Sequence, residues 1–470
     1  MGSVGISFGS PTSGQGFDVA TTVSQIVANL QATETPWQNQ LTSLQSQDTA
    51  LSGIGTDLSS LSTALQSLTD FEGTLTEKEG SSSDTSVLQL TGADNTAVAG
   101  SHTVVVSQLA QTSSYYSDDI GASDILSGSL TINGQTVTIS DGTAQDGSGN
   151  TIPQNNTLAT LVSYINSGDY GVTAQVTTDS DGERLDLISN TSGASGSITV
   201  DAGNLTDTTT AADNPVTFTG QAGLDASMTV DGIPMTSASN TVTAAIPGVT
   251  FQLLSAAPDE SVQVEITNNN SDVETAVSNF VTAYNAVVKD LNTQEGDDSS
   301  GNAEPLYGSP TIALLQEQLQ QALNFTQSSG AVTSLTQLGV TASSSDDGTL
   351  TMDSATLDSM LNSNYQDVVN FFQPSGSFTS FGGNLTTVID NLTNTAPYGA
   401  IYLALQQNSG EESQLNTNIT GENSVISAEQ TQLTTELNEA NYTLQEIPSQ
   451  LQEVNEMYSA ISGYNENSNG

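Results

Sequence analysis

The chain has 470 residues, and 52 Asp and Glu against 3 Lys and Arg give it a formal charge of −49 at pH 7. Nucleic acid and anionic membrane surfaces are disfavoured as partners, because binding phosphate requires a basic patch and the only Lys and Arg residues are Lys78, Arg184 and Lys289. Cysteine is absent, which excludes disulfides, thiol nucleophiles and thiolate metal ligands.

The beginning of the chain carries no basic segment and no apolar run, so we expect no Sec-type signal peptide. No stretch approaches the ~20 apolar residues that a membrane-spanning helix needs, so no membrane insertion is expected. The sequence pI is about 4.1, and the chain approaches neutrality near that pH because it has almost no permanent positive charge. We hypothesise that the protein works outside the cell in an acidic medium.

The N-terminal end is expected to form two helices. The first runs from Val19 to Leu30 with Asp18 as its N-cap, and Pro36 marks the joint with the second. From Trp37 to Leu68 apolar residues recur in steps of 3, 4 or 7, which predicts one long helix with a narrow apolar seam.

The middle of the chain is expected to form antiparallel strands, because apolar and polar residues alternate there around turn-forming pairs. Three hairpins are predicted, at Ser129 to Ile139 around Asn133-Gly134, Val172 to Ile188 around Asp181-Gly182, and Met228 to Met235 around Asp231-Gly232. Further strands are expected at Val87 to Leu90, Thr103 to Leu109, Ser197 to Val200, Val249 to Leu254 and Val262 to Ile266. A short helix from Leu158 to Ile165 has Thr157 as its N-cap, and Gly80 to Asp84 is expected as a polar connector.

Helical periodicity returns after Asn270. Helices are predicted from Val273 to Leu291 and from Ile312 to Leu323. From Ile426 to Ile461 the apolar residues again follow 3-4 spacing, and Pro448 is expected to kink this helix or to begin a new segment.

These patterns predict an α+β multidomain fold. Long coiled-coil helices at the two ends pack together, and a β-rich head of antiparallel hairpins is inserted between them. The expected divisions are an N-terminal helical leg at 1–75, a head domain formed by 76–115 and 215–270, a second head domain inserted at 116–214, and a C-terminal helical region and leg at 271–470.

The terminal seams are the predicted interaction sites. A seam two positions wide per heptad is more typical of helix exchange between subunits than of a globular core, although packing within one chain is the alternative. The predicted interaction residues are Val19, Val23, Ile26, Leu30, Leu58, Leu61, Leu65, Leu433, Leu437, Leu444, Leu451, Val454 and Tyr458.

Enzyme chemistry is not expected. The single histidine, His102, lies in a strand-like run and is interpreted as an ordinary strand residue, since a Cys-His pair or multi-His metal site cannot be built. The Asp-rich turns at Asp141 to Asn150 and Thr178 to Gly182 offer oxygen ligands but lack the acidic residue that completes a calcium loop, so solvated turns are favoured. No catalytic, cofactor-binding or metal site is predicted, and no cofactor.

Several segments, in order along nearly the whole chain, resemble the flagellar filament cap family, also called hook-associated protein 2. The weakest part of the resemblance lies between Ser113 and Gly220, and basic residues that this family usually carries after the position of Glu34 are missing here. The segments that carry the resemblance are Gly16 to Val27, Glu34 to Pro36, Gly100 to Ala110, Arg184 to Ser189, Ala226 to Ile233, Ile246 to Leu253, Val277 to Val287, Leu338 to Thr341, Asp347 to Asp353 and Asp367 to Phe372.

The resemblance implies a structural protein that caps the distal end of the bacterial flagellar filament. Such caps form a homo-oligomeric ring of about four to six subunits, with helical legs that contact flagellin and a β-rich plate beneath which exported flagellin folds and polymerises instead of being lost to the medium. It further implies an extracellular location at the filament tip, secretion through the flagellar type III export apparatus, and a cytoplasmic export chaperone.

Three alternatives remain open from the sequence. Flagellin or another hook-associated structural protein shares helical ends and a β-rich middle. An acidic extracellular adhesin at the filament tip is compatible with the Ser- and Thr-rich hairpins. A secreted acid hydrolase is supported by the abundant carboxylates alone.

Overall fold

The computed structural model describes residues 15–180, 182–209, 214–345, 347–374, 379–394 and 398–462. These residues form two compact units. The helical unit combines the chain up to Thr69 with the chain from Glu274 onward, and the β unit is Asp70–Val273. The predicted α+β fold, with terminal helices and a β-rich insertion, is confirmed.

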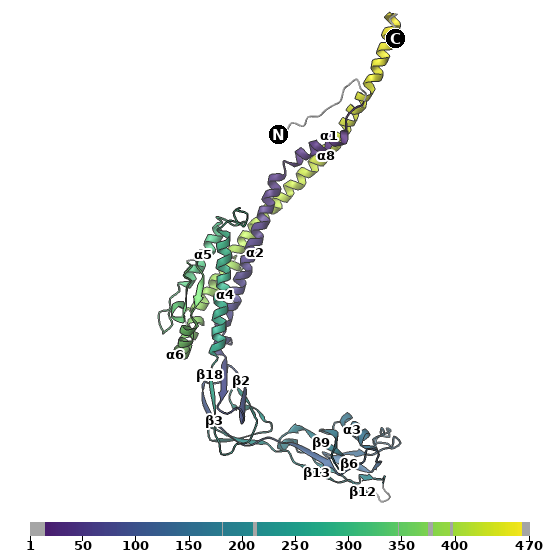
Figure 1. The fold of residues 1–470 in the computed structure, drawn as a ribbon, viewed down its shortest axis with the longest axis vertical. Helices are drawn as coiled ribbons and strands as arrows, with labels where there is room; N and C mark the ends of the chain where they lie inside the picture. The colour runs from purple at the N-terminus through teal and green to yellow at the C-terminus, as the bar shows by residue number, and fades with distance from the viewer. Residues whose placement is uncertain are drawn as a thin grey trace. The chain divides into compact units, whose positions relative to one another are not determined.

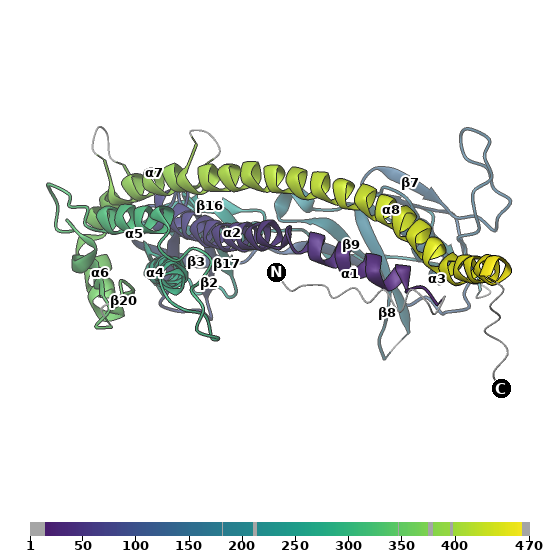
Figure 2. The same cartoon turned by 90° about the horizontal axis from the view of Figure 1, so that it is seen from above.

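The helical unit is built around long helices from both ends of the chain. Helices α1 and α2 lie side by side with α8 in both views (Figures 1 and 2), so the predicted packing of the chain ends is confirmed. The helical unit also contains a two-stranded sheet, in which β19 (Val340–Ala342) pairs with β20 (Leu350–Met352). The helices are α1 Val19–Gln31, α2 Thr35–Thr69, α4 Asn270–Gln294, α5 Pro310–Leu323, η3 Leu335–Leu338, α6 Ser354–Phe372, α7 Phe381–Thr393 and α8 Ala400–Ser462.

The core of the helical unit has two parts. The first part is a row of leucines on α2 that includes Leu58, Leu61 and Leu65, each of which is at most 1% exposed. A phenylalanine cluster gathers side chains from α4, α6 and α7: Phe371 stacks on Phe381 with ring centroids 5.0 Å apart, and Phe280 meets Phe381 edge-on at 6.0 Å. Such aromatic pairs add about 0.5–1.5 kcal/mol each beyond their buried area.

The β unit contains antiparallel sheets and one helix, α3 (Leu158–Ser167). The sheet orders are β1-β18-β3-β14-β15, β16-β17-β2, β13-β4-β9-β8, β10-β6-β7 and β12-β11-β5. The strands are β1 Lys78–Ser82, β2 Leu88–Ala93, β3 Gly100–Gln108, β4 Thr112–Ser117, β5 Leu126–Ser127, β6 Ser129–Ile132, β7 Gln135–Thr138, β8 Val172–Thr178, β9 Glu183–Ser192, β10 Val200–Asp201, β11 Thr206–Asp207, β12 Asn214–Pro215, β13 Phe218–Gln221, β14 Ala226–Val230, β15 Ile233–Ser237, β16 Thr241–Ile246, β17 Val249–Leu253 and β18 Val262–Asn268.

Two hydrophobic cores lie within the β unit. One joins residues of 87–110 with residues of 226–266, and the other joins residues between Ile120 and Val216. The division of this unit into two separate head domains, and the exact boundaries expected from the sequence, stay predictions.

The three predicted hairpins are confirmed. In two of them the turn residues adopt positive φ, at Asn133 (52°) with Gly134 (78°) and at Asp231 (50°) with Gly232 (80°). This is the backbone of a type I′ turn, whose twist matches that of the paired strands. The third hairpin pairs β8 with β9, and Asp181 of its turn lies outside the described residues.

Two expectations were wrong, and one of the two alternatives at Pro448 is excluded. Gly80 to Asp84 is not simply a connector, because most of it belongs to β1, which pairs with β18. The strand expected at Ser197 to Val200 includes only Val200 in β10. Pro448 does not begin a new helical segment, since α8 continues through that residue to Ser462, and the alternative expectation of a kink there stays a prediction.

Thr157 gives a direct test of the local structure in the β unit. Its side chain accepts a hydrogen bond from the Thr160 N–H, and the Thr160 hydroxyl accepts one from the Thr157 N–H, which closes a capping box on α3. We expect Thr157→Ala to lower the free energy of unfolding of this region by about 1 kcal/mol, because a helix N–H loses its acceptor. Amide hydrogen exchange of α3 measures the change. Thr157→Ser keeps the cap and should retain protection, and equal exchange in both variants would contradict the assignment.

Candidate assembly surface on the terminal helices

Helix α1 is held against α8 by a small apolar core. Val19, Val23 and Val27 of α1 and Ile426 of α8 are buried, with Phe17, Leu30, Leu433 and Leu437 partly buried around them. The sequence produces this helix locally, because the Asp18 carboxylate caps it by accepting the Thr21 N–H at 3.1 Å. The core is narrow because α1 contributes about one residue per turn and α8 contributes only Ile426, Leu433 and Leu437.

Neutral amides of α8 add polar links to the N-terminal helices. Asn441 accepts the Phe17 N–H at 2.8 Å, and the Asn408 amide donates to the Asp48 carboxylate at 2.7 Å. From Ala400 to Ser462 the sequence has nine Glu residues and neither Lys nor Arg. The helix pairing is therefore built from apolar contact and amide hydrogen bonds instead of ion pairs.

Glu34 lies at the corner between α1 and α2 and is an unusual case. Only 2% of this residue is exposed, and its Oε2 accepts hydrogen bonds from the amides of Gln38 (3.3 Å) and Asn423 (3.2 Å). Its Oε1 has no hydrogen-bond partner among the described residues. Burying a carboxylate oxygen without a hydrogen-bond partner costs free energy, so Glu34 lowers the stability of the helix pair at this corner.

The predicted interaction residues fall into three groups. Leu58, Leu61 and Leu65 fill the core of the helical unit, so a partner cannot reach them while this unit stays folded. A second group forms the contact between α1 and α8, and Leu444 is half-buried further along α8. This second group is Val19, Val23, Ile26, Leu30, Leu433 and Leu437.

The third group lies exposed near the end of α8. Leu451, Val454 and Tyr458 are 44%, 56% and 67% exposed. The predicted interaction residues did not include two further exposed apolar residues of this stretch, Met457 (60%) and Ile461 (86%), although Ile461 ends the predicted seam. We call these five residues the α8 end strip. Exposed large apolar side chains that recur along one helix are a surface on which binding of a partner can be proposed.

One buried position of the α1 face was not among the predicted interaction residues. Ile26 was chosen for the seam, whereas Val27 is the buried residue and Ile26 is half-buried. The spacing of Val19, Val23 and Val27 by four residues is the signal that could have identified it.

One pair of carboxylates gives the helical unit a dependence on pH. Burial raises the pKa of Asp57 on α2, and the neighbouring carboxyl group of Asp290 on α4 raises it further. Two carboxylates this close disfavour the doubly ionised state, so the folded unit retains a proton that the unfolded chain would release.

The residues considered for catalysis and metal binding have ordinary roles. The His102 ring lies 2.7 Å from the Asp231 carboxylate, whose other oxygen accepts the Thr103 N–H, so it is a strand residue with a local partner, as predicted. Hydrogen bonds from Thr143 and Asn150 lower the pKa of Asp141 and Asp146 respectively. Among the described residues no group of three or more His, Asp or Glu side chains could hold a metal ion. Within the described part of the chain, no helix is long and apolar enough to cross a membrane.

Two family models match the chain. The model described as Flagellar hook-associated protein 2 C-terminus matches residues 223–465, and the model described as Flagellar hook-associated protein 2 N-terminus matches residues 15–113. The first covers more than half of the 470 residues, and it includes the whole of α8.

Individual relatives agree with these matches. The B-type flagellar hook-associated protein 2 of Pseudomonas aeruginosa is 28% identical over 314 residues, which is 62% of this chain and 65% of that protein. The flagellar hook-associated protein 2 of Escherichia coli K12 is 25% identical over 394 residues, 80% of this chain and 83% of that protein. The crystal structure of the D1-D2-D3 domains of the flagellar cap protein FliD from Escherichia coli has a similar fold, with a TM-score of 0.55 at 23% identity over 77% of this chain and 99% of that chain.

Leu61 and Leu451 are predicted to differ in their effect on stability. Leu61 is fully buried and Leu451 is 44% exposed. We expect Leu61→Ala to lower the free energy of unfolding of the helical unit by about 2–5 kcal/mol, whereas Leu451→Ala should change it by less than about 0.5 kcal/mol. Urea titration followed by circular dichroism measures both, and equal losses would contradict the division between core and surface.

Asp57→Asn is predicted to reduce the pH dependence of the helical unit. Because the pKa of Asp57 is raised in the fold, its protonated form stabilises the fold at low pH, and this contribution is lost as pH rises through the raised pKa, above the ordinary 3.8. The variant should gain stability relative to the wild type as pH rises toward 7. Melting temperatures across this range test the prediction. Glu439→Gln, on an exposed residue of α8, is the control, and a matching gain there would contradict the role of the pair.

Proposed function

Because the chain belongs to the flagellar hook-associated protein 2 family, we propose that it is the structural protein that caps the distal end of a bacterial flagellar filament. In this role it promotes the folding and polymerisation of exported flagellin and prevents the loss of flagellin to the medium. The role requires binding surfaces and no catalytic group. The observation that carries it for this chain is the α8 end strip, which exposes apolar residues at the end of a long helix pair.

The α8 end strip contributes binding free energy only when a neighbouring helix covers it. Removing apolar surface from water contributes roughly 25 cal/mol per Å², so five large side chains covered by a partner can contribute several kcal/mol before ordering costs are paid. Its flanking residues include Glu453 and Glu456 and no basic side chain. Contacts of this kind are moderate in strength, which suits a cap that moves as each flagellin subunit is added.

The proposed partners are further copies of the chain, flagellin and an export chaperone. We propose a homo-oligomeric ring of about four to six subunits. At neutral pH the charge of −49 on each chain opposes its assembly, so the ring must be held by apolar and neutral hydrogen-bonding contacts. We place the protein outside the cell at the flagellar tip and propose secretion through the flagellar type III apparatus, with a chaperone bound beforehand.

A strain that lacks its cap gene tests the function. We expect such a strain to release flagellin monomers into the medium without building filaments, and the full-length chain to restore filaments. A full-length variant with Leu451→Gln, Val454→Gln and Ile461→Gln should be secreted normally but leave most flagellin in the medium, because these exposed residues no longer bury apolar surface. Electron microscopy and immunoblotting of the medium measure both results.

A matched variant separates loss of contact from general damage to α8. Gln450→Ala with Asn455→Ala alters neighbouring exposed polar positions of the same helix and should restore filaments like the wild type. Normal filaments in the strain without any cap gene would refute the capping role. Full restoration by the triple glutamine variant would instead refute the role of the α8 end strip and leave capping intact.

A further inference from the structure

A small apolar groove lies between α1 and α8, beside the core that joins the two helices. Its volume is about 260 Å³, and its apolar residues are Ile26, Leu30 and Leu433, which are half-buried. Pockets that hold small molecules are larger, with volumes of about 300–1,000 Å³, so this groove suits one large side chain of a partner. The three side chains leave apolar surface in contact with water, and covering that surface would be favourable.

Two glutamates of α8 line the same groove. Glu429 and Glu436 are exposed and seven residues apart, and Leu433 lies between them in the sequence. Seven residues of helix span about 10.5 Å and return to the same face, so the two carboxylates lie along one side of α8. Glu436 accepts a hydrogen bond from the Gln432 amide at 2.8 Å, which leaves most of its acceptor sites open.

Glu422 continues this series seven residues earlier, at the corner between α1 and α2. The Thr33 hydroxyl donates to its carboxylate at 3.5 Å, and the next residue, Asn423, donates to Glu34. Glu34 is 2% exposed, and its Oε1 has no hydrogen-bond partner among the described residues. A cation bound near Glu422 would lower the cost of this buried carboxylate. We call Glu422, Glu429 and Glu436 the acidic row.

The chain itself supplies little positive charge for the acidic row. Helix α1, which forms the other side of the groove, has no charged residue. In paired helices the residues that flank an apolar seam are often Glu and Lys, and they decide which helix pairs with which. The basic residues of the chain are Lys78 on β1, Arg184 on β9 and Lys289 on α4. A second copy would bring mostly further carboxylates, so the acidic row favours a different protein as its partner.

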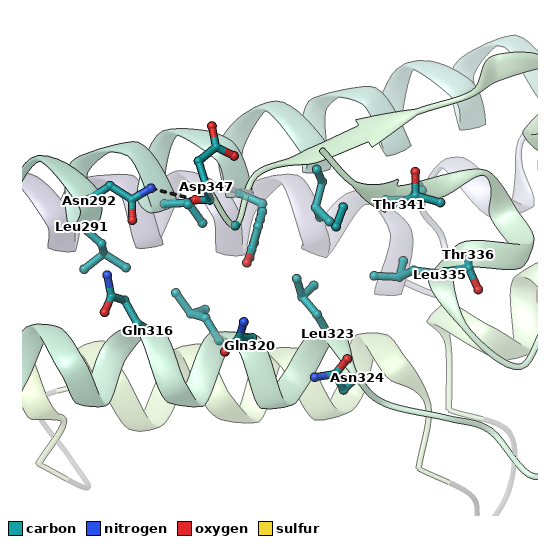
Figure 3. A pocket seen from close by; sticks show the side chains of 17 residues that line it. Leu291, Asn292, Gln316, Gln320, Leu323, Asn324, Leu335, Thr336, Thr341 and Asp347 are labelled. Atoms are coloured by element: carbon teal, nitrogen blue, oxygen red, sulfur yellow. Dashed lines mark hydrogen bonds between the residues drawn. The ribbon is translucent and has the colours of Figure 1, made fainter. Parts of the chain in front are cut away.

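The larger cavity in Figure 3 lacks such a charge pattern. It has a volume of about 450 Å³ and lies among α4, α5, η3 and the β19–β20 hairpin. Gln316 and Gln320 on one side are neutral, and the Asp347 carboxylate accepts hydrogen bonds from Thr349. Asn292 donates to the Asp347 backbone carbonyl at 2.7 Å. The acidic row, by contrast, selects a partner by charge.

We propose that the groove and the acidic row together bind a basic amphipathic helix of another protein. This helix places a leucine, or a side chain of similar size, in the groove between two Arg or Lys residues that are seven positions apart and face Glu429 and Glu436. A third basic residue, seven positions further along, faces Glu422. The groove supplies apolar burial, while the acidic row supplies charge selection and orientation. The surface is separate from the α8 end strip, and the inference does not depend on the capping role.

A synthetic helical peptide tests the proposal with the full-length chain. The probe is an end-blocked, alanine-rich peptide of about 18 residues, because shorter isolated helices are only marginally stable. It carries three Arg residues seven positions apart and a Leu midway between successive Arg residues. We expect binding by fluorescence anisotropy that weakens as salt rises from about 0.05 to about 0.5 M, since exposed ion pairs are screened. Replacing the Leu residues by Ala should weaken binding more than about tenfold, the effect of burying one leucine side chain.

A second peptide measures the attraction that comes from the net charge of −49 alone. It has the same composition, but its three Arg residues lie on different faces of the helix. Because only one of them can then face the acidic row, this peptide should bind at least about tenfold more weakly than the first.

Matched variants test the acidic row from the protein side. Glu429→Gln with Glu436→Gln should weaken binding about three- to tenfold, the loss of two exposed ion pairs. Glu446→Gln with Glu453→Gln removes the same charge at the same spacing from exposed positions of α8 outside the groove, and should bind like the wild type. Glu429→Arg with Glu436→Arg should bind a peptide with Glu in place of Arg more tightly than the wild type does.

The outcomes distinguish specific binding from general attraction. Absence of binding at low salt, equal binding of the two Arg peptides, or equal weakening by the two glutamine pairs would overturn the proposal. Unchanged binding of the peptide without Leu would overturn the role of the groove. Sedimentation of the chain alone tests a second copy as the occupant: self-association that Glu429→Gln with Glu436→Gln strengthens more than the control pair does would overturn the choice of a different protein. None of these results alters the test of capping in a strain that lacks its cap gene.

Discussion

The helical unit depends on apolar contact between the two ends of the chain. Phe17 and Asn441, which are joined by a hydrogen bond, are 424 residues apart in sequence, and the core between α1 and α8 consists of a few valine, leucine and isoleucine side chains. No local signal could hold these ends together across such a loop, because closing it costs chain entropy that only long-range burial offsets. Residues of α8 that α1 covers belong to this core, whereas the residues of the α8 end strip are exposed.

The near absence of positive charge decides how the remaining contacts are made. Asparagine amides donate to Asp48 and Glu34, where ion pairs with Lys or Arg would serve in a chain of ordinary composition. A hydrogen bond from a neutral amide to a carboxylate contributes roughly 1.5–3 kcal/mol and loses less to salt than a surface ion pair does. The carboxylates are left to repel one another, as Asp57 and Asp290 show. Assembly of such chains must rely on shape and apolar area more than on electrostatic attraction.

Local patterns were sufficient for many elements. The hairpins at Asn133-Gly134 and Asp231-Gly232 follow from residues that accept positive φ, and α3 follows from its cap at Thr157. The helices α6 and α7 were not predicted, because their apolar residues serve the phenylalanine cluster, which joins side chains far apart in sequence. The mistaken connector at Gly80 to Asp84 has a similar cause, since β1 is polar and forms by pairing with β18.

The sequence by itself determined the class of the protein: helical ends, a β-rich insertion, a strongly acidic character and a series of motifs that point to one family. It could not distinguish Leu61 from Leu451, because both lie at the same spacing on long amphipathic helices. The tertiary structure decided that Leu61 is core and Leu451 is surface. Periodicity shows which face of an element is apolar, whereas burial depends on which distant element covers that face.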